Sequence, residues 1–132
     1  MNLVWEVAQL PLYTIALNPS AARVAFAVLH CTVGDGIIAA ATFLLTGLLL
    51  RDVDWPSSRP RAGGAIVTAL GIAYTAGSEW YNVYEIGAWA YSPHMPLIVG
   101  IGLAPLLQWL VVPVATLLMV RASRISDSSR LL

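Results

Sequence analysis

The chain has 132 residues, of which 58% are hydrophobic and 11% are charged, and its mean hydropathy is +0.75. A soluble domain carries about 25% charged residues, so this composition excludes that class and indicates an integral membrane protein. Seven arginines balance seven acidic residues and lysine is absent, so no basic stripe exists and no nucleic-acid partner is expected. The single cysteine, Cys31, excludes an intrachain disulfide and any cysteine pair that would hold zinc.

Four apolar segments predict four helices. A helix rises about 1.5 Å per residue, so about 20 residues cross a hydrocarbon core about 30 Å thick. The predicted helices cover residues 2–17, 22–50, 62–86 and 95–121. We expect an all-α fold: a single integral membrane bundle of four helices over residues 1–121, followed by a polar tail over residues 122–132.

The first segment, residues 2–17, is shorter than the others and contains Glu6 and Pro11. As a helix it would reach only about 24 Å. It therefore either crosses the membrane thinly or forms a re-entrant half-helix. A cleaved signal peptide is a third interpretation, which the lack of a basic start and the early Glu6 disfavour. We expect the four-helix path, with the re-entrant path as the alternative.

The arginines predict the orientation of the bundle. Six of the seven fall in residues 51–61 and 121–132, whereas Arg23 lies toward the opposite side. Positive charge is retained on the cytoplasmic side of a membrane. We therefore expect a multi-pass protein of the bacterial cytoplasmic (inner) membrane, with both termini and residues 51–61 inside and residues 87–96 outside.

Counting residues along each predicted helix from the outer boundary of the membrane assigns a depth to each polar side chain. His30 and Glu79 fall about 10 and 12 Å deep, so we expect them to approach each other across neighbouring helices. Glu6, Asp35 and Gln108 fall roughly 16 to 20 Å deep and are expected to form a second polar layer. Ionisable groups at such depths are costly and are therefore candidates for function.

One face of the helix predicted over residues 62–86 carries small and polar residues at intervals of three and four. They are Gly64, Thr68, Gly71, Thr75, Ser78, Asn82 and Glu85. From residue 64 to residue 78 this stripe is interpreted as a packing seam, because small residues let helices approach closely. Asn82 and Glu85 are assigned instead to a binding site with Glu79, because packing has no need of two carboxylates.

Aromatic residues gather near the predicted outer boundary. They are Trp80, Tyr81, Tyr84, Trp89 and Tyr91. An interfacial aromatic belt accounts for Trp89 and Tyr91. Trp80 and Tyr81 lie deeper and flank Glu79, where an apolar surrounding would make this carboxyl group a usable general acid.

These residues suggest catalytic roles for Glu79 as acid, His30 as base and Asp35 as an orienting or charge-stabilising group. A structural hydrogen bond is the alternative role of His30. The expected ligand-binding residues are Asn82, Glu85, Trp80, Tyr84, Trp89, Tyr91, Gln108 and Glu6. A metal would draw on His30, Asp35, Glu79 and His94, but no HxxxH, HxxE or CxxC spacing supports it, so no metal site is expected.

Several short runs carry a resemblance to a known family. They are WE (5–6), HCTVGD (30–35), GSEWYNV (77–83), GAWAYS (87–92), MP (95–96) and GIGLAPLLQW (100–109), with Gln9 and Pro11. Together they resemble a family of small bacterial polytopic membrane proteins to which no activity is assigned. The resemblance covers most of the chain and implies a membrane bundle without naming a reaction.

A more distant similarity is to the three-helix subunits of the membrane carotenoid (lycopene) cyclases. The residues that match that family in order are Trp80, Gly87, Trp89, Tyr91, Gly100, Ile101, Leu103 and Pro105. Leu107 and Gln108 stand where the family has paired glutamates, and Tyr81 stands in place of its aspartate. The resemblance therefore implies a related fold and a lipophilic ligand, but not the cyclase chemistry.

Three functions fit these observations. The first is an acid/base enzyme, or a binding protein, for a lipophilic isoprenoid-like molecule in the membrane. The second is a non-enzymatic accessory subunit that docks a partner membrane protein, a second copy of the chain or a pigment. The third is a transporter or metal-handling protein that uses the polar residues as a path. Bound lipid or pigment would favour the first two, and bound metal the third. The cofactor is unknown from the sequence, and whether the protein is an enzyme stays open.

Overall fold

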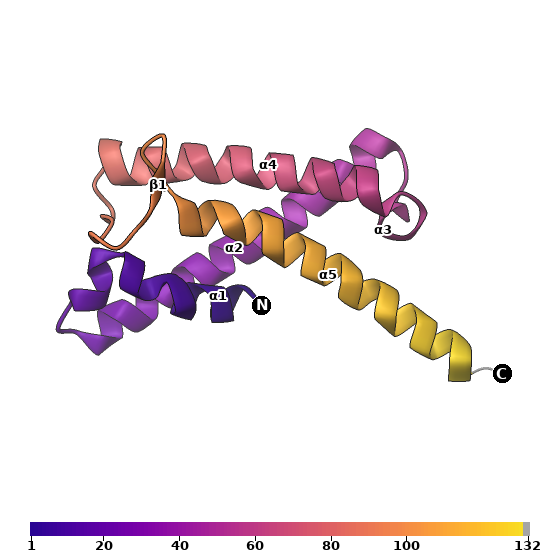
Figure 1. Ribbon diagram of the computed structural model, residues 1–132, viewed down its shortest axis with the longest axis horizontal. Helices are drawn as coiled ribbons and strands as arrows, with labels where there is room; N and C mark the ends of the chain where they lie inside the picture. Colours follow the sequence, from indigo (N-terminus) through magenta and orange to yellow (C-terminus); the bar gives the residue numbers. More distant parts are fainter. Residues whose placement is uncertain (131–132) are drawn as a thin grey trace.

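Three long helices make up most of the molecule, which the computed structural model describes over residues 1–130 (Figure 1). They are α2 (Ala21–Leu50), α4 (Pro60–Trp80) and α5 (Leu103–Arg130). The chain enters α2 at Ser20, whose hydroxyl accepts a hydrogen bond from the Arg23 N–H. It leaves α2 at Arg51 in the left-handed conformation that commonly ends a helix. The predicted all-α class is confirmed.

α4 packs against both other long helices, whereas α2 and α5 make little direct contact with each other. Two tryptophans fill the space over glycines of α4. A Cβ atom at Gly71 would lie 2.0 Å from Cε3 of Trp109, and one at Gly63 would lie 1.9 Å from Cε3 of Trp55. Trp55 belongs to the short helix α3 (Trp55–Ser58). The predicted seam on α4 thus allows close approach at Gly71, where only a glycine fits.

The first segment is a short helix followed by tighter turns. α1 (Asn2–Gln9) gives way to 3₁₀ turns at Leu10–Leu12 and Thr14–Leu17. Pro11, in the first of these turns, has no N–H to continue a helical ladder. The predicted helix over residues 2–17 is therefore too long, and α1 rises only about 12 Å. This geometry corresponds to the half-helix of the alternative path.

The connection from α4 to α5 is longer than predicted. α4 continues into a π turn at Tyr81–Glu85, and the hairpin of β1 (Leu97–Ile98) and β2 (Ile101–Gly102) precedes α5. The helix expected from residue 95 thus begins at residue 103. An isolated bridge between Tyr13 and Tyr91 ties the first segment to this connection. At the other end α5 runs to Arg130 through most of the predicted tail, and residues 131–132 lie outside the described residues.

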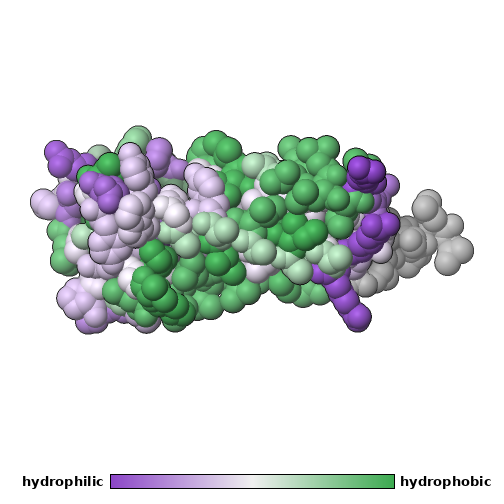
Figure 2. All heavy atoms as spheres, turned by 90° about the horizontal axis from the view of Figure 1, so that it is seen from above, coloured by the Kyte–Doolittle hydropathy of each residue, from purple (hydrophilic) through white to green (hydrophobic). Residues whose placement is uncertain are grey.

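Two helices in residues 1–130 are long and apolar enough to cross a membrane, α2 and the Leu103–Val120 part of α5. Their most apolar windows are only 11% and 33% buried inside the molecule. Figure 2 shows apolar side chains over the middle of one face and hydrophilic residues toward its two ends. The predicted membrane bundle of four helices is not confirmed, because α1 is short and α4 is rich in small and polar residues.

Candidate functional site

A cavity of about 630 Å³ lies between α1, α2, α4, the start of α5 and residues 87–90 of the connection. Its volume falls in the range of roughly 300 to 1,000 Å³ that is typical of small-molecule sites. Glu6, Asp35 and Glu79 contribute three acidic side chains to its lining. Among the described residues of that lining, the imidazole of His30 is the single basic group. The cavity is therefore acidic and lacks a strong counter-charge.

The deep part of the cavity joins side chains from three helices. Gln108 Nε2 donates a 2.6 Å hydrogen bond to Asp35 Oδ2, and Gln9 Nε2 donates a 2.8 Å bond to Glu6 Oε1. The carboxyl groups of Glu6 and Asp35 both line the cavity and lie close enough to influence each other. The structure thus brings together the three residues of the predicted second polar layer.

The sequence spacing of α1 explains how it reaches this cluster. Gln9 follows Trp5 by four positions and Glu6 by three, so its side chain can contact both of them on the helix surface. Trp5 Nε1 donates a 3.2 Å hydrogen bond to Gln9 Oε1, which orients the amide toward Glu6. Glu6 and Gln9 are both buried. Every polar group on this face therefore has a partner within the protein.

Glu79 forms a second cluster with two phenols. Tyr91 donates a 2.6 Å hydrogen bond to Glu79 Oε2, and Tyr13 donates a 3.2 Å bond to the same oxygen. The Tyr91 hydroxyl also accepts a 3.0 Å bond from the Gly102 N–H. Burial, reinforced by the Glu79 carboxylate, raises the pKa of Tyr91 and Tyr13 above the ordinary value of 10.0. Both phenols are therefore protonated donors at neutral pH.

The indole of Trp89 lies beside the same carboxylate and lines the cavity. Its Nε1 atom is buried, yet it has no hydrogen-bond partner of good geometry within residues 1–130. A buried donor without an acceptor costs about 1–3 kcal/mol. The Trp89 N–H is therefore a group that an oxygen atom of a ligand would stabilise.

The predicted pair of His30 and Glu79 is not formed. Both residues line the cavity, but the donors to Glu79 Oε2 are phenols, and the exposed ring of His30 stacks on Phe26 with 5.7 Å between ring centroids. The physical reason is the bridge between Tyr13 and Tyr91. It brings the Tyr13 hydroxyl to the position beside Glu79 that the depth count assigned to His30.

The predicted aromatic walls of Glu79 are also wrong. Trp80 and Tyr81 are 51% and 52% exposed, because neighbours on a helix project about 100° away from Glu79. Tyr84 is 52% exposed and donates its hydroxyl to the Gly100 carbonyl oxygen at 2.6 Å. Tyr13, Tyr91 and Trp89 form the surroundings of this carboxyl group instead.

The remaining predicted binding residues divide into two groups. Glu6, Asn82, Trp89 and Gln108 line the cavity, whereas Trp80, Tyr84 and Glu85 do not. The Asn82 side chain donates a 2.8 Å hydrogen bond to the Ser78 carbonyl oxygen within α4. Tyr91 acts through its bond to Glu79.

Sequence reasoning missed Gln9 and Tyr13. The spacing of Gln9 three residues after Glu6 is a usable indication, whereas Tyr13 reaches Glu79 through a non-helical segment that no periodicity describes. Within the described part of the chain, no group of three or more His, Cys, Asp or Glu side chains is arranged to hold a metal ion. His94 is exposed and lies outside the cavity lining.

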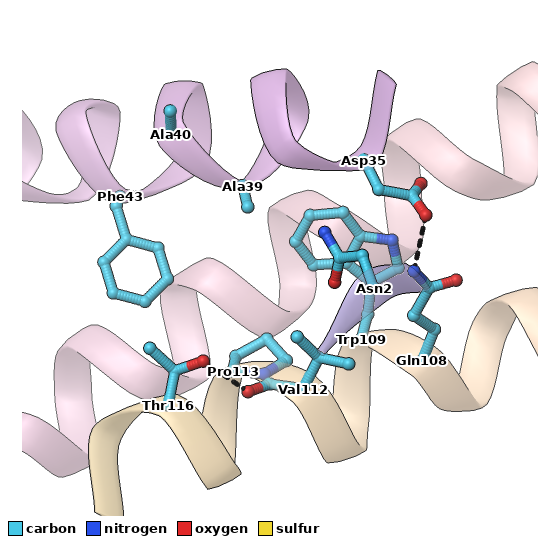
Figure 3. A pocket seen from close by; sticks show the side chains of 10 residues that line it. All are labelled: Asn2, Asp35, Ala39, Ala40, Phe43, Gln108, Trp109, Val112, Pro113 and Thr116. Atoms are coloured by element: carbon cyan, nitrogen blue, oxygen red, sulfur yellow. Dashed lines mark hydrogen bonds between the residues drawn. The ribbon is translucent and has the colours of Figure 1, made fainter. Parts of the chain in front are cut away.

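A groove of about 350 Å³ between α2 and α5 adjoins the cavity (Figure 3). Its apolar lining consists of Ala39, Ala40, Phe43, Trp109, Val112 and Pro113. Asp35 and Gln108 line both the groove and the cavity, so their hydrogen bond stands where the two meet. Asn2, the first residue of α1, also lines the groove. α1 therefore covers the space between α2 and α5 beside the cavity, and the groove lies at its amino end.

Comparisons of the chain with protein-family models, with curated proteins and with solved structures find no match. The chemistry of the cavity and groove is therefore the basis for assigning a function.

Proposed function

We propose that this chain is a small integral membrane protein whose cavity binds the polar end of a lipophilic, isoprenoid-like molecule. The observation that carries the proposal is the continuity of an acidic cavity with an apolar groove at Asp35 and Gln108. A site of this kind suits a ligand with one polar end and one apolar chain, because each part has a matching surface.

The exposed apolar side chains of α2 support insertion in a membrane. Phe26, Leu44 and Leu48 are 70%, 71% and 74% exposed, and their neighbours on the helix are largely apolar. An apolar surface of this extent on a soluble monomer would cause aggregation, whereas lipid chains would cover it. We propose that α2, α4 and α5 span the bacterial inner membrane and that α1 enters it as a half-helix. The arginine distribution assigns the carboxyl end to the cytoplasm.

The groups near Glu79 favour a hydroxyl group as the polar end of the ligand. The Trp89 N–H needs an acceptor, and Glu79 is an acceptor that already draws two phenolic donors. A hydroxyl oxygen accepts one hydrogen bond and donates another, so it serves both residues at once. A long-chain alcohol such as a prenol therefore fits the cavity chemically.

An acid/base enzyme acting on the same ligand is the second candidate. The observation that favours it is that Glu6 and Asp35 bring two neighbouring carboxyl groups to the same cavity, because such a pair can release a proton and take it back. In this reaction Glu6 and Asp35 exchange the proton. The sequence instead predicted acid and base roles for Glu79 and His30 and an orienting role for Asp35. The accessory-subunit and transport functions have no comparable observation in their favour.

The test uses Cys31, the single cysteine of the chain, which lines the cavity. The rate of maleimide labelling is measured on purified protein in detergent with increasing amounts of a twenty-carbon prenol. We expect saturable protection of Cys31. The control is a Cys31→Ala, Val33→Cys variant, because Val33 is 61% exposed and lies outside the cavity lining. The prenol should leave labelling of the control unchanged.

Two further variants connect the binding to Glu79. Glu79→Ala should weaken protection by the prenol, whereas Glu85→Ala, which removes an exposed carboxyl group outside the cavity, should not. Thermal melting of each variant checks that it is folded. Labelling of Cys31 at the same rate with and without prenol would contradict the proposed function.

A further inference from the structure

We infer that the apolar chain of this ligand leaves the cavity through the groove between α2 and α5, past the hydrogen bond of Asp35 to Gln108. The inference rests on the proposed function and adds the route by which the ligand passes between the membrane and the cavity. The route would open sideways into the hydrocarbon layer of the membrane, so the ligand would enter without passing through water.

Packing is closer where α4 meets each of the other two long helices. Trp109 fills the space over Gly71 between α4 and α5, and a Cβ atom at Gly64 would lie 3.2 Å from Leu117. Between α2 and α4, the partly buried side chains of Ile38 and Ile72 pack on the buried core. α2 and α5 differ, because they make little direct contact and leave the groove between them.

The composition of the groove agrees with an apolar chain as its occupant. Six of its ten lining residues are apolar, and one of these six, Ala40, is exposed at the edge of the groove. Its polar residues include Asp35 and Gln108, which it shares with the cavity, and Asn2 at the start of α1. The bond of Asp35 to Gln108 therefore marks the boundary between the part of the ligand that needs hydrogen bonds and the part that does not.

The route predicts that prenols of different chain length respond differently when the groove is blocked. On the proposed route, a five-carbon prenol would keep its polar end and its whole chain within the cavity, whereas the extended chain of a twenty-carbon prenol would reach past Asp35 and Gln108 into the groove. A bulky side chain in the groove should therefore weaken binding of the long alcohol and leave the short one unaffected.

The experiment compares Ala40→Trp with Ala41→Trp. Both alanines are exposed on α2, but Ala40 lines the groove and Ala41 does not. Affinity for each prenol is measured by protection of Cys31 from maleimide, and thermal melting verifies folding. We expect Ala40→Trp to weaken the affinity for the twenty-carbon prenol by about tenfold or more and to leave the affinity for the five-carbon prenol unchanged. Ala41→Trp should change neither.

A second measurement needs no variant. A twenty-carbon alcohol with a diazirine at its far end should cross-link to residues 39–43 or 112–116 of the parent protein. Equal affinity of parent and Ala40→Trp for the long prenol, or cross-links confined to other segments, would overturn the route while the cavity still binds. If the parent binds neither prenol, the proposed function fails and the route fails with it.

Discussion

Asp35 of α2 accepts a 2.6 Å hydrogen bond from Gln108 of α5, a residue 73 positions further along the chain. Because these two helices touch little elsewhere, the bond fixes their separation at the point where the cavity and the groove meet. Gln108 is buried, so its side-chain amide has little access to water as a substitute partner.

Replacing Gln108 by alanine should therefore destabilise the protein. The change leaves a carboxyl oxygen of Asp35 without its donor, which costs about 1–3 kcal/mol. The free energy of unfolding is measured with denaturant in detergent micelles. Leu107→Ala is the matched control, because Leu107 is the preceding residue and is 37% exposed. Equal losses in the two variants would show that the hydrogen bond contributes nothing.

Glu6 offers a second test in the same cluster. Glu6→Gln keeps an oxygen for the Gln9 donor and gains N–H groups that can reach Asp35. Its free energy of unfolding should therefore lie within about 1 kcal/mol of the parent value. Glu6→Ala removes these contacts and should cost about 1–3 kcal/mol. Thermal melting of both variants distinguishes the two results. A larger loss for Glu6→Gln than for Glu6→Ala would contradict the polar contacts assigned to Glu6.

The glycines of α4 predict opposite effects of the same substitution. Gly71→Ala forces a Cβ atom against Trp109, and overpacking of this kind costs about 1–3 kcal/mol. A Cβ atom at Gly77 meets nothing within 4 Å, so Gly77→Ala should stabilise the helix by up to about 1 kcal/mol. Melting temperatures that shift in the same direction would contradict the packing of α4 against α5.

The raised pKa of Tyr91 predicts how stability depends on alkaline pH. The folded protein holds the phenolic proton more tightly than the unfolded chain, whose tyrosines titrate near the ordinary value of 10.0. The contribution of Tyr91 to stability is therefore complete below about pH 10 and is lost as the pH rises above it. Between pH 8 and pH 11, the free energy of unfolding should fall less for Tyr91→Phe than for the parent. Tyr81→Phe, at a 52% exposed position, should behave like the parent.

The arginine distribution predicts that a reporter fused after residue 132 reports a cytoplasmic location. Six of the seven arginines lie in residues 51–61 or 121–132, and positive charge favours the cytoplasmic side of a membrane. The measurement pairs a reporter active only inside the cytoplasm with one active only outside it. Activity of the second reporter alone would reverse the proposed orientation.

The three long helices were predictable because each is a long apolar run of uniform periodicity. The first segment was not, because Pro11 redirects the chain into turns after Gln9. The late start of α5 had an indication in the sequence: Pro96 and Gly100 interrupt the apolar run where the hairpin forms. Length and hydropathy alone do not distinguish such a hairpin from the beginning of a helix.

Depth counting succeeded where the counted segments are continuous helices. Asp35 and Gln108 lie on α2 and α5, and Glu6 lies within α1, so a fixed rise per residue brought the three together. The count failed at Glu79, because its phenol partners come from non-helical segments. Tyr13 and Tyr91 meet through a bridge between residues 78 positions apart, which only the tertiary structure reveals.

The position of α1 also bears on the order in which the molecule is completed. The ribosome makes α1 before α5, yet the cluster around Glu6 and Asp35 includes Gln108 of α5. α1 can pack on α2 before α5 is made, but the cluster is complete only when α5 has joined it. Cys31 in a nascent chain stopped before residue 103 should react with thiol reagents faster than in the released chain, and equal rates would contradict this order. The cluster is thus begun by α1 and α2 and completed by α5.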